Sequence, residues 1–365
     1  MTNRATNSLA DWRRFGDPSF RVYHYLALCQ GVVGVLAGFD VIIPFALAIG
    51  CTPALAVLLG VLPLAGGMAQ LAMPRLLDRT NGNLRGLTVL TAAISEPRGL
   101  YFAFLALLVA SGLVAGVLGV LILAALVALT SVLSSVVGSN LLSWYSAVLP
   151  EDQRRLVVPR MFAVSLAIGA LLLLPMALLL DRLSHTFGVM AYALPFVVSG
   201  VLGIGEILVL RRLAHPGRVV VPPSAVEGEP DPSTAPDFAR FLRVTAINAL
   251  GMGFAPSMSV FIISVLGLSA GFSMTVGAIG ILTMVVAAAV AGAHLTSGSS
   301  QSMLRHSFWI RAGAMALPLF ALPGTVTAPL FLIGSIMLGS IGFASGQLAA
   351  NERLFRLIRG PAVVR

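Results

Sequence analysis

Ten long apolar runs constrain this chain more than any other feature of its sequence. A helix that crosses the hydrocarbon core of a bilayer needs about 20 mostly apolar residues, and each run reaches that length. Because backbone polar groups must be satisfied inside lipid, such runs predict an all-α integral membrane protein, a polytopic bundle of about ten transmembrane helices. The predicted spans are 23–49, 54–74, 86–111, 117–145, 157–180, 188–210, 240–265, 269–294, 304–323 and 327–350.

Arginines separate these runs in an alternating pattern. Short cytoplasmic loops are enriched in basic residues, whereas external loops are not. With the N-terminal segment placed inside, every second connection carries arginine, and only Arg182 falls on the outside. The pattern predicts a multi-pass protein of the cell (inner) membrane with both termini in the cytoplasm. The arginines assigned to the cytoplasmic side include Arg4, Arg13, Arg14, Arg21, Arg75, Arg79, Arg85, Arg154, Arg155, Arg160, Arg211, Arg212, Arg305, Arg311, Arg353, Arg356 and Arg359.

A polar segment divides the spans six plus four. Residues 213–237 hold six prolines and four acidic residues without an apolar period, which is typical of a flexible connector. The predicted organisation is a cytoplasmic tail (1–22), a six-helix bundle (23–212), a cytoplasmic linker (213–237), a four-helix bundle (238–350) and a cytoplasmic C-terminal tail (351–365).

Composition excludes several classes of protein. Charged residues make up only 10% of the chain, against roughly a quarter in a soluble domain. The excess of arginine lies between apolar runs and therefore indicates topology, not nucleic-acid binding. The chain has no lysine, so a lysine Schiff base and a P-loop are excluded. We find no metal-binding or catalytic motif, and we expect no enzyme activity, no metal and no cofactor.

Two cytoplasmic stretches and one internal repeat carry a family resemblance. After the second span the chain reads PRLLDRTNGNLRGL, with an acidic and basic pair followed by a further arginine: Asp78, Arg79 and Arg85. After the fourth span it reads SWYSAVLPEDQRRLVVPR, whose distinctive residues are Trp144, Pro150, Arg154, Arg155 and Arg160. GSNLLSW at the end of the fourth span is similar to SGQLAAN at the end of the tenth, and this similarity pairs Asn140 with Gln347.

With these stretches and its long central linker, the chain resembles bacterial members of the major facilitator superfamily. Members of that family usually have twelve spans, and this chain ends after the tenth. The resemblance implies a secondary active or facilitative transporter that moves a small solute by alternating access. It also implies that Asp78, Arg79 and Arg85 form a cytoplasmic gating motif; plain topology signalling is the alternative. A transporter-derived membrane scaffold or assembly factor without transport activity is the second hypothesis.

Polar residues inside the spans supply the candidate sites, since ionisable groups in hydrocarbon usually face a cavity or a partner. Asp40 lies about 25 Å along the first span at 1.5 Å per residue. It is a candidate for proton coupling or for binding a cationic group, and a structural hydrogen bond is the alternative. The resemblance places further substrate or proton candidates on cavity-lining helices: Gln30, Asn140, Asn248, Ser257 and Gln347.

Two other intramembrane sites receive structural interpretations. Glu206 lies near the cytoplasmic end of its span, where its side chain can reach the headgroups. Glu96 and Arg98 flank Pro97, and i,i+2 neighbours on a helix do not face each other. A local break at Pro97, or a pairing with another helix, is therefore the prediction for them.

Overall fold

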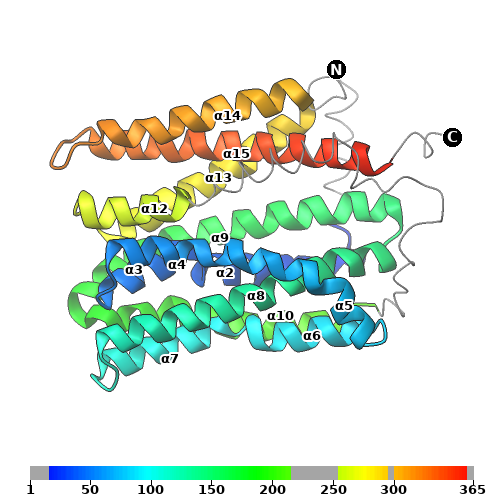
Figure 1. The fold of residues 1–365 in the computed structure, drawn as a ribbon, viewed down its shortest axis with the longest axis horizontal. Coiled ribbons are helices and arrows are strands. Elements are labelled where there is room, and N and C mark those ends of the chain that lie inside the picture. The colour runs from blue at the N-terminus through cyan, green and yellow to red at the C-terminus, as the bar shows by residue number, and fades with distance from the viewer. Residues whose placement is uncertain (1–15, 215–253, 295–299, 360–365) are drawn as a thin grey trace. The chain divides into compact units, whose positions relative to one another are not determined.

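A computed structural model describes residues 16–214, 254–294 and 300–359, and these residues form helices joined by short turns (Figure 1). From the N-terminus the helices are η1 (Pro18–Phe20), α2 (Arg21–Leu36), α3 (Phe39–Ala48), α4 (Pro53–Gly66), η2 (Gly67–Ala72), α5 (Met73–Arg79), α6 (Leu84–Ser95), α7 (Arg98–Ala110), α8 (Gly116–Val148), α9 (Glu151–Phe187), η3 (Gly188–Tyr192) and α10 (Ala193–Arg212). After the central segment come α12 (Phe254–Val260), η5 (Phe261–Val265), α13 (Ala270–His294), α14 (Ser300–Ala316), η6 (Leu317–Phe320) and α15 (Ala328–Arg359).

Six helical stretches of the described chain are long and apolar enough to cross a membrane. One of them, Val157–Arg212, has 56 residues, far more than a single crossing needs. It contains α9 and α10, and Gly188 between them has a φ of 54°, a left-handed conformation that glycine adopts readily. The two spans predicted there are thus two helices joined by a turn. The all-α membrane architecture is confirmed, and the count of ten spans stays a prediction.

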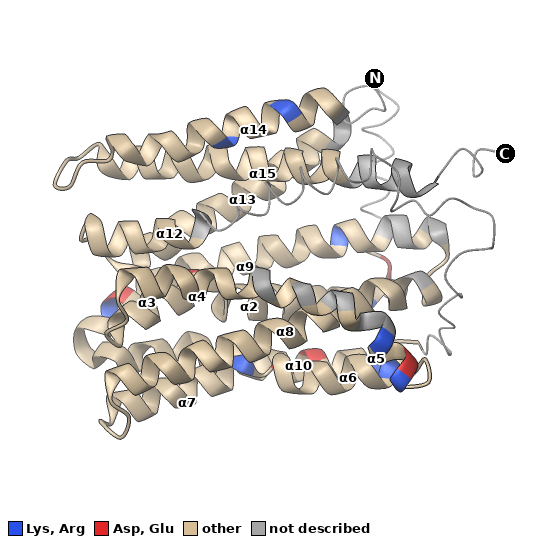
Figure 2. Cartoon of the chain, viewed as in Figure 1, with Lys and Arg blue, Asp and Glu red and all other residues tan. Residues whose placement is uncertain are grey.

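The outer surface of these helices is apolar. Figure 2 shows few charged residues along the described helices, and several of them gather where α5 meets α6. Large apolar side chains such as Leu121, Leu171 and Leu178 are more than half exposed. A soluble monomer rarely exposes contiguous apolar surface on this scale, whereas lipid tails solvate it.

Two of the predicted spans are interrupted helices. The first span breaks at Ala37 and Gly38, between α2 and α3. The third breaks at Glu96 and Pro97, between α6 and α7, as the sequence predicts. Proline has no N–H to donate to the preceding turn, so Pro97 removes one helical hydrogen bond at this break.

The described chain divides into two compact units, which we treat separately: residues 16–214 with 255–278, and residues 279–294 with 300–359. In the first unit α2 packs against α9 and α10, α10 against α7, and α8 against α4, α6 and α7. Phe196 of α10 forms edge-to-face contacts with Phe45 and Phe102, at centroid distances of 5.3 and 5.4 Å, and so ties α3 and α7 together.

A close approach between α2 and α9 depends on Gly31. A Cβ atom at Gly31 would overlap the backbone carbonyl of Ser165, whereas a Cβ at Gly34 would meet nothing within 4 Å. We expect Gly31→Ala to destabilise the protein by about 1–3 kcal/mol through overpacking. Gly34→Ala is the matched control on the same helix and should be neutral or slightly stabilising. Thermal unfolding in detergent measures both, and equal melting temperatures for the two variants would contradict the close contact.

In the second unit α14 and α15 pack along each other. Ser335 donates to the carbonyl of Ala314 at 2.7 Å, and the guanidinium carbon of Arg311 lies 6.0 Å from the centre of the Phe343 ring. Arg311 is only 8% exposed. Arg311 is therefore a buried residue of α14, within the predicted span 304–323, and its assignment to the cytoplasmic side stays a prediction.

Candidate functional site

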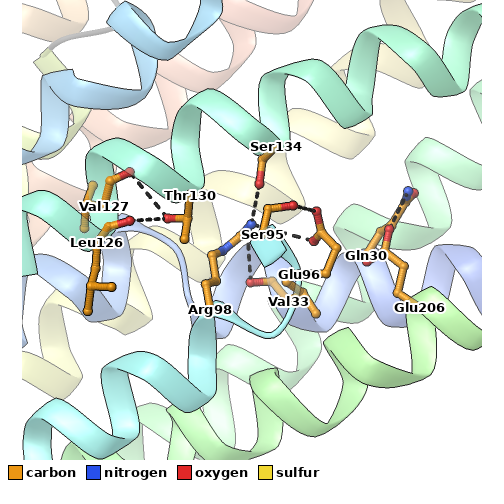
Figure 3. Close-up of polar contacts among 10 residues, drawn as sticks. All are labelled: Gln30, Val33, Ser95, Glu96, Arg98, Leu126, Val127, Thr130, Ser134 and Glu206. Carbon is orange, nitrogen blue, oxygen red and sulfur yellow. Dashed lines mark hydrogen bonds and ion pairs between the residues drawn. The ribbon is translucent and has the colours of Figure 1, made fainter. Parts of the chain in front are cut away.

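A buried polar cluster lies inside the first unit, where α2, α8 and α10 meet the break between α6 and α7 (Figure 3). Its members are Gln30, Ser95, Glu96, Arg98, Ser134 and Glu206. The sequence predicts a structural role for Glu206 at the headgroups. In the structure Glu206 is 2% exposed, and its Oε1 accepts a hydrogen bond of 3.1 Å from Gln30 Nε2. The side chain of Glu206 therefore does not extend to the lipid headgroups.

Arg98 is the cation of this cluster. Its Nη1 lies 3.7 Å from Glu96 Oε2 and donates to Ser134 Oγ at 2.9 Å. Its Nη2 donates to the carbonyl of Val33 at 3.5 Å. Ser95 Oγ donates to Glu96 Oε1 at 2.9 Å, so both oxygens of Glu96 face a donor. The predicted break at Pro97 is what allows Glu96 and Arg98 to face each other despite their i,i+2 spacing.

The packing of α10 holds the break in place. A Cβ at Gly203 would overlap the backbone carbonyl of Glu96, so only glycine allows α10 to approach this closely. Glu206 follows Gly203 by three residues and therefore lies on the same face of α10. The sequence thus brings a carboxyl group of α10 to the ion pair of the α6–α7 break.

Glu206 has one oxygen without a partner. Among the described residues, no group bonds its Oε2, although that atom is buried. Glu206 interacts electrostatically with both Glu96 and Arg98. The cluster thus joins two buried carboxyl groups to a single guanidinium. The sequence singled out Gln30 as a candidate, but it did not identify Glu206 as its partner.

Asp40 lies in a second polar region of the same unit. It belongs to the first turn of α3 and is half-buried. A Cβ at Gly277 of α13 would overlap the carboxylate of Asp40, so the two residues are in close contact. The predicted site residue therefore faces a helix from the later part of the chain, and glycine at position 277 makes room for its carboxylate.

A neighbouring contact joins α9 to the start of α13. Asp181 Oδ2 accepts from Ser269 Oγ at 2.7 Å, and its Oδ1 accepts from the backbone N–H of Gly271 at 2.8 Å. Asp181 therefore satisfies a free N–H at the N-terminus of a helix about 90 residues later in the chain. We name the contact of Asp181 with Ser269 and Gly271 the α9–α13 clasp. It lies at the end of the bundle that the arginine pattern predicts to be external.

The three residues of the predicted cytoplasmic gating motif lie in α5 and α6. Asp78 and Arg79 are exposed at the end of α5, and no ion pair joins Asp78 to Arg79 or Arg85 within the described part of the chain. Arg85 Nη2 instead donates to the carbonyl of Arg211 at 2.6 Å. This hydrogen bond satisfies a carbonyl at the C-terminus of α10 and so holds α6 to α10. The gating role of the three residues stays a prediction.

The second cytoplasmic stretch has a clear structural component. Trp144 is 1% exposed and donates from Nε1 to the carbonyl of Ala214 at 2.8 Å, where the chain leaves α10. Pro150 is the residue that precedes α9. Arg154, Arg155 and Arg160 lie in the first three turns of α9, and Arg160 is half-buried.

The other predicted site residues lie in separate places. Asn140 on α8 is 1% exposed, and neither side-chain polar atom has a partner among the described residues. Ser257 on α12 is half-buried. Gln347 on α15, which occupies the position equivalent to Asn140 in the internal repeat, is exposed. Asn248 lies outside the described residues. In the parts of the chain that the structure covers, no three His, Cys, Asp or Glu residues could hold a metal ion.

Comparisons with known proteins identify the fold. The sequence matches no family model and no curated protein. Among solved structures, a mutant form of the nucleoside transporter NupG matches with a TM-score of 0.61 and 13% identity, over 91% of this chain and 81% of that one. A D-xylose-proton symporter matches with a TM-score of 0.59 and 10% identity, over 91% and 82%. The protein is therefore a multi-pass membrane protein that shares its fold with these two transporters, and this likeness agrees with the resemblance that the sequence motifs carry.

Proposed function

We propose that this chain is a transporter of the major facilitator type that moves a small solute across the cell membrane by alternating access. The observation that carries the proposal is the likeness of 91% of the chain to a nucleoside transporter and a sugar-proton symporter. The predicted cytoplasmic motifs and the alternating arginine pattern support the inner membrane as its location and the cytoplasm as the side of both termini.

The α9–α13 clasp gives the mechanism a defined element. Alternating access requires contacts that hold one end of the bundle closed and break when that end opens. Asp181 bonds the start of α13, and Asp40 contacts the same helix at Gly277, six residues further on. Six residues of helix span about 9 Å. The proposal is that these two contacts close the external end and separate when the solute enters from outside.

The polar groups of the described interior favour one chemical class of solute. The described interior of the first unit offers amide, hydroxyl and carboxyl groups, and its Arg98 is already bonded to Ser134 and Glu96. Such groups suit an uncharged solute rich in hydroxyl groups. The two solved neighbours are described as carriers of a nucleoside and of D-xylose, which fits this class.

Uptake into proteoliposomes tests the proposal. The reconstituted full chain should accumulate a radiolabelled nucleoside or pentose above empty liposomes, and unlabelled solute of the same class should compete. No uptake of any solute in a broad panel, from a protein that unfolds cooperatively in detergent, would favour the scaffold hypothesis instead.

Asp40→Asn addresses the coupling proposal. If Asp40 carries the coupling proton, the rate of uptake driven by an inward proton gradient should fall at least about tenfold in the variant. Solute exchange without a gradient should be retained. Asn has nearly the same size as Asp, so the contact with Gly277 is preserved. Unchanged gradient dependence would remove Asp40 from the coupling role and leave the transporter proposal standing.

A further inference from the structure

The cluster around Glu206 contains more acid than base. Glu96 is 6% and Glu206 2% exposed, and Arg98 is the only cation that contacts them in the described chain. With both carboxyl groups ionised, the cluster would hold one uncompensated negative charge inside the bundle. Burying such a charge in a medium of low dielectric constant costs several kcal/mol, and a bound proton cancels it.

We propose that Glu96 and Glu206 form a proton-binding site that holds one proton, with Arg98 as the counter-ion of the carboxylate that stays ionised. The reaction is the addition of a proton to a carboxylate oxygen, so no bond other than the O–H bond forms. This site is separate from Asp40, which lies on another helix beside α13. The proposal concerns proton binding alone and does not depend on transport.

The hydrogen bonds indicate which carboxyl group holds the proton. Glu96 faces Ser95 Oγ on one oxygen and Arg98 on the other, and both contacts favour its ionised form. Glu206 accepts from the neutral amide of Gln30 on Oε1, while Oε2 is buried and unbonded among the described residues. An ionised oxygen in that position would be left without any donor. Glu206 is therefore the carboxyl group that carries the proton in this arrangement.

The other titratable groups around Glu206 do not alter the charge count. Cys29 of α2 and Tyr145 of α8 interact electrostatically with Glu206, and both side chains are neutral at pH 7. Arg85 of α6 is directed to the carbonyl of Arg211 at the end of α10. Among the described groups that interact electrostatically with Glu206, the charge-bearing ones are thus the carboxyl group of Glu96 and the guanidinium of Arg98.

Infrared spectroscopy of the purified full chain in detergent tests the site directly. A protonated carboxyl group has a C=O band that is separate from that of a carboxylate and shifts in D₂O. We expect the wild-type protein to show this band at pH 7 and Glu206→Gln to lose it. We also expect Glu96→Gln to lose it, because Glu206 can then ionise beside Arg98.

The two variants together keep the test decisive if one of them fails to fold. Asp40→Asn is the control that separates the two candidate proton sites, and it should retain the band. A wild-type protein without the band would overturn the proposal. So would a band that persists in both glutamate variants, or one that disappears in Asp40→Asn alone.

Discussion

Arg98→Met should lower the melting temperature of the detergent-solubilised protein more than any other single arginine substitution in the described helices. Methionine fills a similar volume but leaves Glu96 and Glu206 without their cation. Removing one partner of a buried ion pair costs about 3–5 kcal/mol, because the remaining charge is left uncompensated. For a chain of this size that loss corresponds to a shift on the order of 10 °C.

A second substitution distinguishes this electrostatic loss from a packing defect. Arg98→Met combined with Glu96→Gln leaves Glu206 as the only acid of the cluster, and one proton then makes the site neutral. We therefore expect the double variant to recover at least half of the lost melting temperature, a coupling typical of groups in direct contact. Arg79→Met is the control, because Arg79 is exposed and should shift the melting temperature little. An Arg98→Met protein as stable as Arg79→Met would rule out Arg98 as the counter-ion.

The membrane architecture could be predicted because it depends on local properties. Span length follows from the thickness of the bilayer, and Pro97, which lacks an N–H, marks a point where a helix is easily interrupted. Both are features of a short stretch of chain. The motif residues gave the fold family by resemblance, and the structural comparison agrees with it at the level of the fold.

The proton-binding cluster could not be predicted in the same way, because its members come from four separate stretches of chain. Glu206 lies close to Arg211 in sequence, which suggested an orientation toward the headgroups. Its actual direction depends on the contact of Gly203 with the backbone of Glu96, a fact of helix packing. One signal was nevertheless present: Gln30, Glu96 and Glu206 all lie in the predicted cytoplasmic half of their spans, and buried polar groups at similar depth seek one another.

For the cytoplasmic motif of Asp78, Arg79 and Arg85, the resemblance predicted the residues but not their bonding partners. The resemblance predicts a motif of Asp78, Arg79 and Arg85, but it could not show that Arg85 bonds the carbonyl of Arg211 instead of Asp78. A free carbonyl at the end of α10 competes for the same guanidinium, and its availability depends on where α10 ends. A family motif therefore predicts residue types at a site better than it predicts their partners in one conformation.

The α9–α13 clasp was missed for a related reason. In the sequence Asp181 is merely the residue before Arg182, the one arginine on the predicted outer side. Its partners Ser269 and Gly271 lie 88 and 90 residues away, and the N–H of Gly271 is a backbone group that no sequence motif marks. Capping by a residue from another helix is visible only once the two helices are placed together.

Asp181→Ala should open the predicted external end of the bundle. The substitution removes two hydrogen bonds to a carboxylate, each worth about 1.5–3 kcal/mol, without adding bulk. Ser273 reports the change well, because it is 2% exposed on α13 and lies one turn from Gly277. With Cys29 and Cys51 replaced by serine, a cysteine at position 273 should react at least about tenfold faster with a membrane-impermeant maleimide when Asp181 is alanine.

Two comparisons determine what an increase in labelling means. Arg182→Gln changes the charge of the neighbouring residue, which bonds no part of α13 among the described residues, and labelling should stay within about twofold of the parent. Faster labelling must also not result from loss of the fold. Asp181→Ala should therefore speed labelling while the protein still unfolds cooperatively in detergent. If Asp181→Ala and Arg182→Gln label at the same rate, the clasp does not control access to this end. Alternating access would then have to depend on other contacts, with Asp40 against Gly277 the first to examine, because the carboxylate of Asp40 fills the space that the glycine leaves on α13.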